Sequence, residues 1–219
     1  MPASRSPEQH LTELVERYPA LREVQCQIAD SFGLLRDSLK NGGTLFVCGN
    51  GGSAADAEHI VGELMKNFIL SRPIPAERRR PLVAAGEDGR WLAERLCGGL
   101  RAISLNGHPS LATALANDSD ARLVFAQPLL ALGRPGDALL GISTSGNAAN
   151  VRLAMVTARA CGMKCIALTG RGGGALRPIA DVTVGVPADG TPAVQELHVP
   201  VYHALCAMLE AAFFGDGAG

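Results

Sequence analysis

Residues 45–53 read LFVCGNGGS, and residues 139–147 read LLGISTSGN. In both stretches a short apolar run, typical of a buried strand, ends in small and polar residues. An Ala-rich segment follows each of them, and the first backbone N–H groups of a helix have no partner within that helix. Such helix starts bind anions readily. The two stretches therefore predict two units of strand, turn and helix, each of which holds an anionic group.

Five short apolar runs predict the strands of one sheet. They are separated by segments with helical periodicity, which is typical of a parallel sheet covered by helices on both faces. The expected strands are residues 44–48, 101–105, 138–142, 163–168 and 181–186. Ligands gather at the carboxyl ends of the strands in such sheets, where both turns fall. We therefore expect an α/β fold with a five-stranded parallel sheet sandwiched by helices.

A chain of 219 residues with 47% hydrophobic residues is expected to form one domain over residues 1–219. Apolar positions at helical spacing predict N-terminal helices over residues 7–39, with a break at Pro19. The Gly/Asp-rich residues 215–219 are expected to fray.

Residues 71–99 interrupt the alternation of strands and helices as an inserted segment. A short helix is expected within it, from about residue 87 to residue 96. The Arg78-Arg79-Arg80 run has two interpretations, either a solvated turn or a part of an added lid or subunit contact.

The charge balance and the cysteine pattern argue against several classes of protein. With 20 basic and 21 acidic side chains, the net charge of −1 gives no general attraction to nucleic acid or to an anionic membrane. The six cysteines form no CxxC pair, which favours reduced, packed thiols over a zinc knuckle or disulfides. The sequence shows no signal core and no run of about 20 apolar residues. We therefore expect a cytoplasmic protein.

Three common nucleotide and hydrolase motifs fail at these turns. Gly49-x-Gly51-x-x-Ala54 fits the dinucleotide fingerprint formally, but the next convincing strand lies about fifty residues on instead of roughly 20. No Gly-Lys-Ser/Thr follows either turn, which excludes a Walker loop. The second turn also lacks the second glycine of a nucleophile elbow. Recognition of a phosphate by hydroxyl and backbone N–H groups remains.

Hydroxyl groups are concentrated in the second turn. Ser143, Thr144 and Ser145 can each donate an O–H, and the helix that starts near Asn147 adds a partial positive charge. A single Ser or Thr at this place would only cap the helix. A run of consecutive small polar residues exceeds what a cap requires, so we predict a phosphate site at this turn, with the first turn nearby.

Candidate acid and base groups lie on two helical segments. His59 and Glu63 are four residues apart, which places an imidazole and a carboxylate on one helix face. His203 lies two turns after Gln195-Glu196, and helical phase alone favours the second of these as its partner. That partner stays open, because Pro200 can distort the phase. A phosphate-binding turn beside an acid/base pair indicates an enzyme that acts on a sugar phosphate.

Together these motifs resemble the phosphoheptose isomerases, the sedoheptulose 7-phosphate isomerases of the sugar-isomerase (SIS) domain superfamily. The resemblance rests on GNGGS at 49–53, His59-x-x-x-Glu63, LLGISTSGN at 139–147 and Gln195-Glu196-x-His198-x-x-x-x-His203. It implies a flavodoxin-like three-layer SIS domain and a homotetramer with active sites at subunit interfaces. It also implies conversion of D-sedoheptulose 7-phosphate to D-glycero-D-manno-heptose 7-phosphate, which begins heptose synthesis for bacterial surface polysaccharides such as lipopolysaccharide.

The resemblance also implies roles for individual residues. Glu63 matches the family's general base and His203 its general acid. Some members bind zinc, and the matching positions here are His59, Glu63, Gln195 and His203. The expected contacts of the substrate and its phosphate are Asn50, Gly51, Gly52, Ser53, Asn117, Asp118, Ser143, Thr144, Ser145, Asn147 and Gln195.

This chain departs from the family pattern at three positions. It has Ala148 where the family often has a serine, Asn67 where an arginine is common and Pro192 where an aspartate is common. With the inserted segment, these differences leave the exact sugar phosphate open. The alternatives are a non-catalytic SIS-domain protein that binds a sugar phosphate, or one that binds the replication initiator protein.

Overall fold

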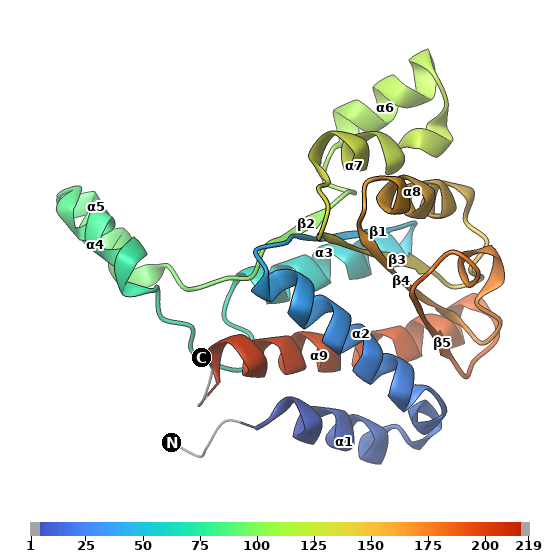
Figure 1. Cartoon of the computed structure of the whole chain (residues 1–219), viewed down its shortest axis with the longest axis horizontal. Helices are drawn as coiled ribbons and strands as arrows, with labels where there is room; N and C mark the ends of the chain where they lie inside the picture. Colours follow the sequence, from blue (N-terminus) through green and yellow to red (C-terminus); the bar gives the residue numbers. More distant parts are fainter. Residues whose placement is uncertain (1–4, 216–219) are drawn as a thin grey trace.

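The computed structural model describes residues 5–215 and contains the predicted five-stranded sheet (Figure 1). Every pair of neighbouring strands is parallel. The strands are β1 (Leu45–Gly49), β2 (Ala102–Ser104), β3 (Ala138–Ser143), β4 (Lys164–Gly170) and β5 (Val182–Val186). Each of them overlaps its predicted range, so the prediction of the fold class is confirmed.

The strand order brings the two predicted turns side by side. The strands are arranged β2-β1-β3-β4-β5, so β2 and β3 flank β1 on opposite sides. The point between β1 and β3 is the topological switch point, where open α/β sheets bind ligands. Gly49 pairs there with Ile142, the residue before Ser143. Both turns therefore open at the same edge of the sheet, from adjacent strands.

Helices cover both faces of the sheet and create two apolar cores (Figure 1). One face carries α1 (Pro7–Arg17), α2 (Gln25–Lys40), α3 (Gly52–Met65) and α9 (Thr191–Phe214). The other side carries α6 (Pro109–Asp118), α7 (Ala126–Leu132) and α8 (Ala149–Ala160), with the short 3-10 helices η2 (Ala121–Leu123) and η3 (Gly174–Leu176). Along β1, Leu45 and Val47 belong to the first core, whereas Phe46 and Cys48 belong to the second. This period of two is expected for a strand covered on both faces.

The N-terminal helices break where the sequence predicts. α1 ends at Arg17, and a 3-10 helix, η1 (Pro19–Val24), leads into α2. Ser6 Oγ accepts a hydrogen bond from Gln9 N, and the Gln9 side chain accepts one from Ser6 N. This capping box fixes the start of α1, which packs against α9 in the first core.

The inserted segment forms an arm that projects from the sheet (Figure 1). It consists of α4 (Ala76–Ala84) and α5 (Glu87–Arg95), which pack against each other. Gly98 N donates to Arg72 O at 2.7 Å, so a hydrogen bond joins the two ends of the arm at its base. The Arg78-Arg79-Arg80 run is exposed but lies within α4, so the interpretation as a turn is wrong. Arginine is a good helix former, and α4 starts directly after Pro75 and contains Pro81.

Helix α9 is apolar enough by length and composition to cross a membrane, with a mean hydropathy of 1.3 in its most apolar window. It is not a continuous apolar run, because Gln195, Glu196, His198, His203 and Glu210 interrupt it. That window is 56% buried inside the fold, between α1, α2 and α3. α9 is the central helix of the first core.

Two remaining predictions concern the cysteines and the tail. All six cysteines are free, as predicted, but only Cys48, Cys165 and Cys206 are buried, and Cys26 is exposed instead of packed. Gly215 follows α9, and residues 216–219 lie outside the described residues, so the expected fraying stays a prediction.

Candidate active site

Both predicted turns lead into helix starts at the switch point. Gly51 has a φ of 56° just before α3, and Gly146 has a φ of 69° before α8. Only glycine adopts such angles without strain. Neither helix has a hydrogen bond from an N-cap side chain. No N-cap side chain therefore competes with an anion at either helix start, although Val151 N donates to Asn150 Oδ1 at 3.0 Å and Ser53 N donates to Asn50 O at 3.0 Å.

The hydroxyl groups of the second turn lie at different depths. Ser143 is buried, Thr144 is half-buried and Ser145 is exposed. Thr144 Oγ1 lies 3.4 Å from the hydroxyl oxygen of Thr191, at the start of α9. Ser145 Oγ accepts a hydrogen bond from Asn147 N at 3.2 Å. Ser145 and Asn147 therefore shape the turn, and α9 begins beside it.

Two side chains that the sequence analysis missed hold the first turn. Asn106, which follows β2, donates to Gly49 O at 2.8 Å. Asn50 and Asn150 exchange hydrogen bonds of 2.9 and 2.8 Å. Because Asn150 lies in the first turn of α8, this contact links the two predicted turns directly. The only sequence signal for Asn106 is its position at the end of an expected strand.

Gln195 reaches the first turn from α9. A Cβ atom added to Gly52 would overlap the Nε2 atom of Gln195. Gly52 therefore makes the room that the Gln195 side chain occupies, and Ser53 beside it is buried. The structure thus brings Gln195 together with the predicted phosphate residues of α3.

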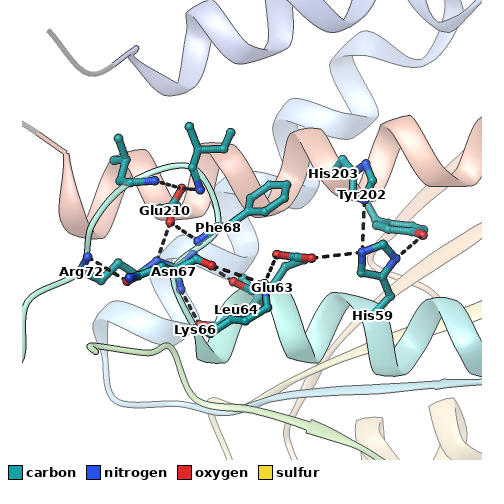
Figure 2. A network of polar contacts seen from close by, with 12 residues as sticks. His59, Glu63, Leu64, Lys66, Asn67, Phe68, Arg72, Tyr202, His203 and Glu210 are labelled. Atoms are coloured by element: carbon teal, nitrogen blue, oxygen red, sulfur yellow. Dashed lines mark hydrogen bonds and ion pairs between the residues drawn. The ribbon is translucent and has the colours of Figure 1, made fainter. Parts of the chain in front are cut away.

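His59 and Glu63 meet on one face of α3, as predicted (Figure 2). His59 Nε2 lies 3.1 Å from Glu63 Oε1, and Lys66 Nζ donates to Glu63 Oε2 at 2.9 Å. Burial raises the pKa of Glu63, but Lys66 and His59 together lower it by more, so the net pKa lies below its usual value. Glu63 is therefore an ionised carboxylate at neutral pH, the state that a general base requires.

His203 approaches this pair from α9. Its Nε2 lies 3.5 Å from His59 Nε2, and its ring centroid lies 5.7 Å from that of Phe68. Burial lowers the pKa of His203, the nearby His59 lowers it further, and Glu63 opposes both. The partner that the sequence left open is therefore His59, because His203 faces α3 and not the preceding turns of its own helix.

A second layer of polar groups orients His59. Tyr202 Oη lies 3.1 Å from His59 Nδ1 and donates to Asp56 Oδ1 at 3.3 Å. Burial and the Asp56 carboxylate raise the pKa of Tyr202, so the phenol keeps its proton. Ionised Glu63 can only accept a hydrogen bond, so the Nε2–H of His59 donates to Glu63 Oε1, and Tyr202 Oη holds the ring from the Nδ1 side. The sequence analysis missed Tyr202 and Asp56, although Asp56 lies one helical turn before His59.

The four predicted zinc ligands are only partly gathered. His59 contacts both Glu63 and His203, whereas Gln195 lies against Gly52. Within residues 5–215, no group of three or more His, Cys, Asp and Glu side chains is arranged to hold a metal ion as the side chains stand.

Asn117 and Asp118 lie apart from the other predicted residues. Both are exposed at the end of α6, a helix that Figure 1 shows at the outside of its layer, beyond α7. Asn117 Nδ2 donates to Asp118 Oδ1 at 2.7 Å. A role in substrate binding stays a prediction for both.

Comparisons with known proteins place this arrangement in a family. Residues 9–79 and 92–170 match the model of the SIS domain. A phosphoheptose isomerase from Akkermansia muciniphila is 36% identical over 202 residues, which cover 92% of this chain and 94% of the relative. This chain belongs to the phosphoheptose isomerase family. A second phosphoheptose isomerase, from Geotalea daltonii, is 42% identical over 89% of this chain and 88% of its own length.

Solved phosphoheptose isomerases share the fold. The structure from Neisseria gonorrhoeae has a TM-score of 0.72 at 33% identity, covering 92% of this chain and 95% of its own. The structure from Francisella tularensis has a TM-score of 0.71 at 30% identity, covering 91% and 93%. Between the two ranges that match the SIS model lie residues 80–91, within the arm. The arm is thus where this phosphoheptose isomerase family member departs from that model.

Proposed function

We propose that this chain isomerises D-sedoheptulose 7-phosphate to D-glycero-D-manno-heptose 7-phosphate. Membership of the phosphoheptose isomerase family gives the reaction class. The observation that carries the proposal is the meeting of Glu63 and His203 around His59. A carboxylate and an imidazole from different helices, close to anion-binding turns, are the groups that a sugar-phosphate isomerisation needs.

The isomerisation moves one proton from C1 to C2 of the open-chain sugar and another between the oxygens of these carbons. Ionised Glu63 takes the C1 proton, which gives an enediol, and returns it to C2. His203, whose lowered pKa favours the neutral imidazole, donates a proton to the carbonyl oxygen and takes one from the neighbouring hydroxyl. Both side chains return to their starting protonation states at the end of the cycle.

The two turns bind the phosphate at the other end of the sugar. The hydroxyls of Ser143, Thr144 and Ser145 and the first N–H groups of α3 and α8 would donate hydrogen bonds to its oxygens. Binding the distant phosphate fixes C1 and C2 beside Glu63 and His203, and such positioning lowers the barrier to proton transfer.

The non-catalytic alternatives are not favoured. A protein that only bound a sugar phosphate or the initiator protein would need the turns or a surface, but not an ionised carboxylate and an imidazole held together. Both groups are in place here, and relatives named phosphoheptose isomerase match about nine-tenths of the chain.

Zinc binding is a further part of the proposal. His59 Nε2 and the Glu63 carboxylate, 3.1 Å apart, are ligand atoms that zinc accepts once Nε2 has released its proton. The residues that would hold the ion are His59, Glu63, Gln195 and His203, so bound zinc would occupy the groups proposed as base and acid. Bound zinc would polarise the sugar oxygens as a Lewis acid. Metal analysis of purified protein should find zinc in the wild type and little in His59→Ala, and equal zinc in both would contradict the ligand set.

Assembly and location follow the same family expectation. We propose a cytoplasmic homotetramer with active sites at subunit interfaces, acting at the start of heptose synthesis for surface polysaccharides such as lipopolysaccharide. Sedimentation should report four chains, and a monomer with full activity would contradict the assembly.

A panel of ketose phosphates tests the proposed reaction. Purified protein is incubated with sedoheptulose 7-phosphate, fructose 6-phosphate and ribulose 5-phosphate, and aldose formation is followed. We expect turnover of the heptose and weaker or no turnover of the shorter sugars. Binding of all three sugars without turnover would indicate that the chain binds sugar phosphates but does not isomerise them.

A further inference from the structure

Arg72 and Glu210 form a buried ion pair next to the candidate active site (Figure 2). Their side chains are 0% and 1% exposed, and Arg72 Nε donates to Glu210 Oε1 at 2.6 Å. Burying two charges costs several kcal/mol per ion, and their attraction restores this only with further hydrogen bonds. A buried pair of this kind is weak evidence for a purely stabilising role, so its other contacts matter.

Arg72 binds the end of the helix that carries Glu63. Its Nη2 donates to the carbonyl oxygen of Glu63 at 3.0 Å, and its Nη1 donates to that of Leu64 at 2.8 Å. These carbonyls belong to the last turn of α3, where a helix leaves its acceptors without partners within the helix. A guanidinium offers two parallel donors and a positive charge, both of which suit a helix C-terminus. Arg72 thus fixes the backbone of Glu63 itself.

Glu210 binds the loop that follows α3. Its carboxylate accepts hydrogen bonds from three consecutive N–H groups, those of Phe68, Ile69 and Leu70, at 3.0, 2.8 and 3.0 Å. This loop carries Lys66, which donates to Glu63 Oε2. It also carries Phe68, whose ring lies beside His203. The loop therefore touches both of the proposed catalytic groups.

The pair also sets the spacing between two helices. Glu210 lies seven residues after His203 on α9, which is close to two full turns. His203 and Glu210 thus lie on the same side of α9, one facing His59 and the other facing Arg72. The end of α3 is tied to α9 at a fixed distance from His203.

We infer that the Arg72–Glu210 pair is a positioning device that holds Glu63 and His203 in the arrangement needed for proton transfer. The inference rests on the proposed isomerase function. Neither residue touches the reacting atoms, and both act through α3, the 66–72 loop and α9. A displacement of about 1 Å at a reacting group can cost roughly a hundredfold in rate.

Two conservative variants test the inference. Arg72→Lys keeps the positive charge but loses the fork that reaches Glu63 O and Leu64 O. Glu210→Asp keeps the negative charge but is one methylene shorter, so it cannot reach all its partners. In each variant we expect kcat for sedoheptulose 7-phosphate to fall by about tenfold or more, while KM changes by less than about threefold. We expect KM to change little because substrate binding depends on the proposed phosphate-binding turns. These turns follow β1 and β3, and neither variant changes a residue in them.

A matched control separates positioning from general destabilisation. Asp137 is also a buried carboxylate, and it accepts hydrogen bonds from Thr44 N at 2.7 Å and Arg134 N at 2.8 Å. It precedes β3, at the opposite edge of the sheet from the site. We expect Asp137→Asn to lower Tm but to leave kcat within about twofold.

A milder variant covers the case in which the first two do not fold. Asn67 is exposed, and its Oδ1 accepts the hydrogen bond of Arg72 N at 3.0 Å. Asn67→Ala should lower kcat severalfold in a folded protein. Folded variants with wild-type kcat, or an equal kcat loss in Asp137→Asn at the same loss in Tm, would overturn the inference. A wild type without turnover would instead overturn the proposed function.

Discussion

His198 predicts a loss of stability in mild acid. The side chain lies in α9 with no exposed surface, and neither ring nitrogen makes a hydrogen bond of good geometry to the described residues, the Thr169 backbone offering only a weak contact. Burial lowers the pKa of His198 from the usual 6.5 to about 4, and the Thr169 backbone opposes only part of this effect. Between these two pH values the unfolded chain binds a proton that the folded chain excludes. The free energy of unfolding therefore falls as the pH falls from 6.5 to about 4.

The size of this loss follows from the two pKa values. Each pH unit between them corresponds to about 1.4 kcal/mol. The whole loss is therefore about 3 kcal/mol, of which about 2 kcal/mol falls between pH 7 and pH 5. A leucine in place of His198 removes the titrating group and keeps an apolar side chain at a fully buried position.

Urea unfolding at pH 7 and at pH 5 measures the effect. The wild type should lose about 2 kcal/mol more than His198→Leu between these pH values. His108→Gln, at an exposed position, controls for the removal of one imidazole and should keep the wild-type pH dependence. An equal pH dependence in the wild type and in His198→Leu would refute the reasoning that this imidazole is held neutral by burial.

Three further predictions concern the turns and the arm. Alanine at both Ser143 and Ser145 should raise KM for the sugar phosphate by about tenfold or more, because charge-assisted hydrogen bonds to the phosphate are lost. An unchanged KM would contradict phosphate binding at this turn. Gly52→Ala should lower kcat/KM by at least about tenfold, since the new methyl group displaces Gln195; wild-type kinetics would show that Gln195 has no part in the reaction. Replacing residues 74–97 by a short Gly/Ser linker should leave Tm within about 2 °C, because α4 contributes no buried residue and α5 packs mainly against α4; a large fall would show that the arm supports the fold.

The sheet could be predicted because its signal is local. A strand buried on both faces is a continuous apolar run. The residue types in the turn that follows are those that the backbone conformation of the turn allows. The same local signals place Ser143, Thr144 and Ser145 at a strand end, and helical spacing places His59 beside Glu63. The interpretation of the Arg78-Arg79-Arg80 run as a turn was wrong. Prolines on both sides suggested a turn, whereas arginine itself favours a helix.

Contacts between distant residues could not be predicted from the same signals. Asn50 meets Asn150 across 100 residues of chain, and Arg72 meets Glu210 across 138. Helical phase shows which residues share a face of α9, but it carries no information about which helix that face meets. Helical periodicity therefore could not predict which residue contacts His203.

Turnover of D-sedoheptulose 7-phosphate by the wild type and by Glu63→Gln tests the central claim most directly. A positioned base contributes about 10²–10⁴-fold, so we predict a fall in kcat of at least about a hundredfold with KM largely retained. In deuterated solvent the wild-type aldose should carry some deuterium at C2, because a proton held on Glu63 exchanges with water. Zinc content, measured on both proteins, separates the loss of a base from the loss of a metal ligand. A folded Glu63→Gln protein with near-normal turnover would contradict the assignment of Glu63 as the base.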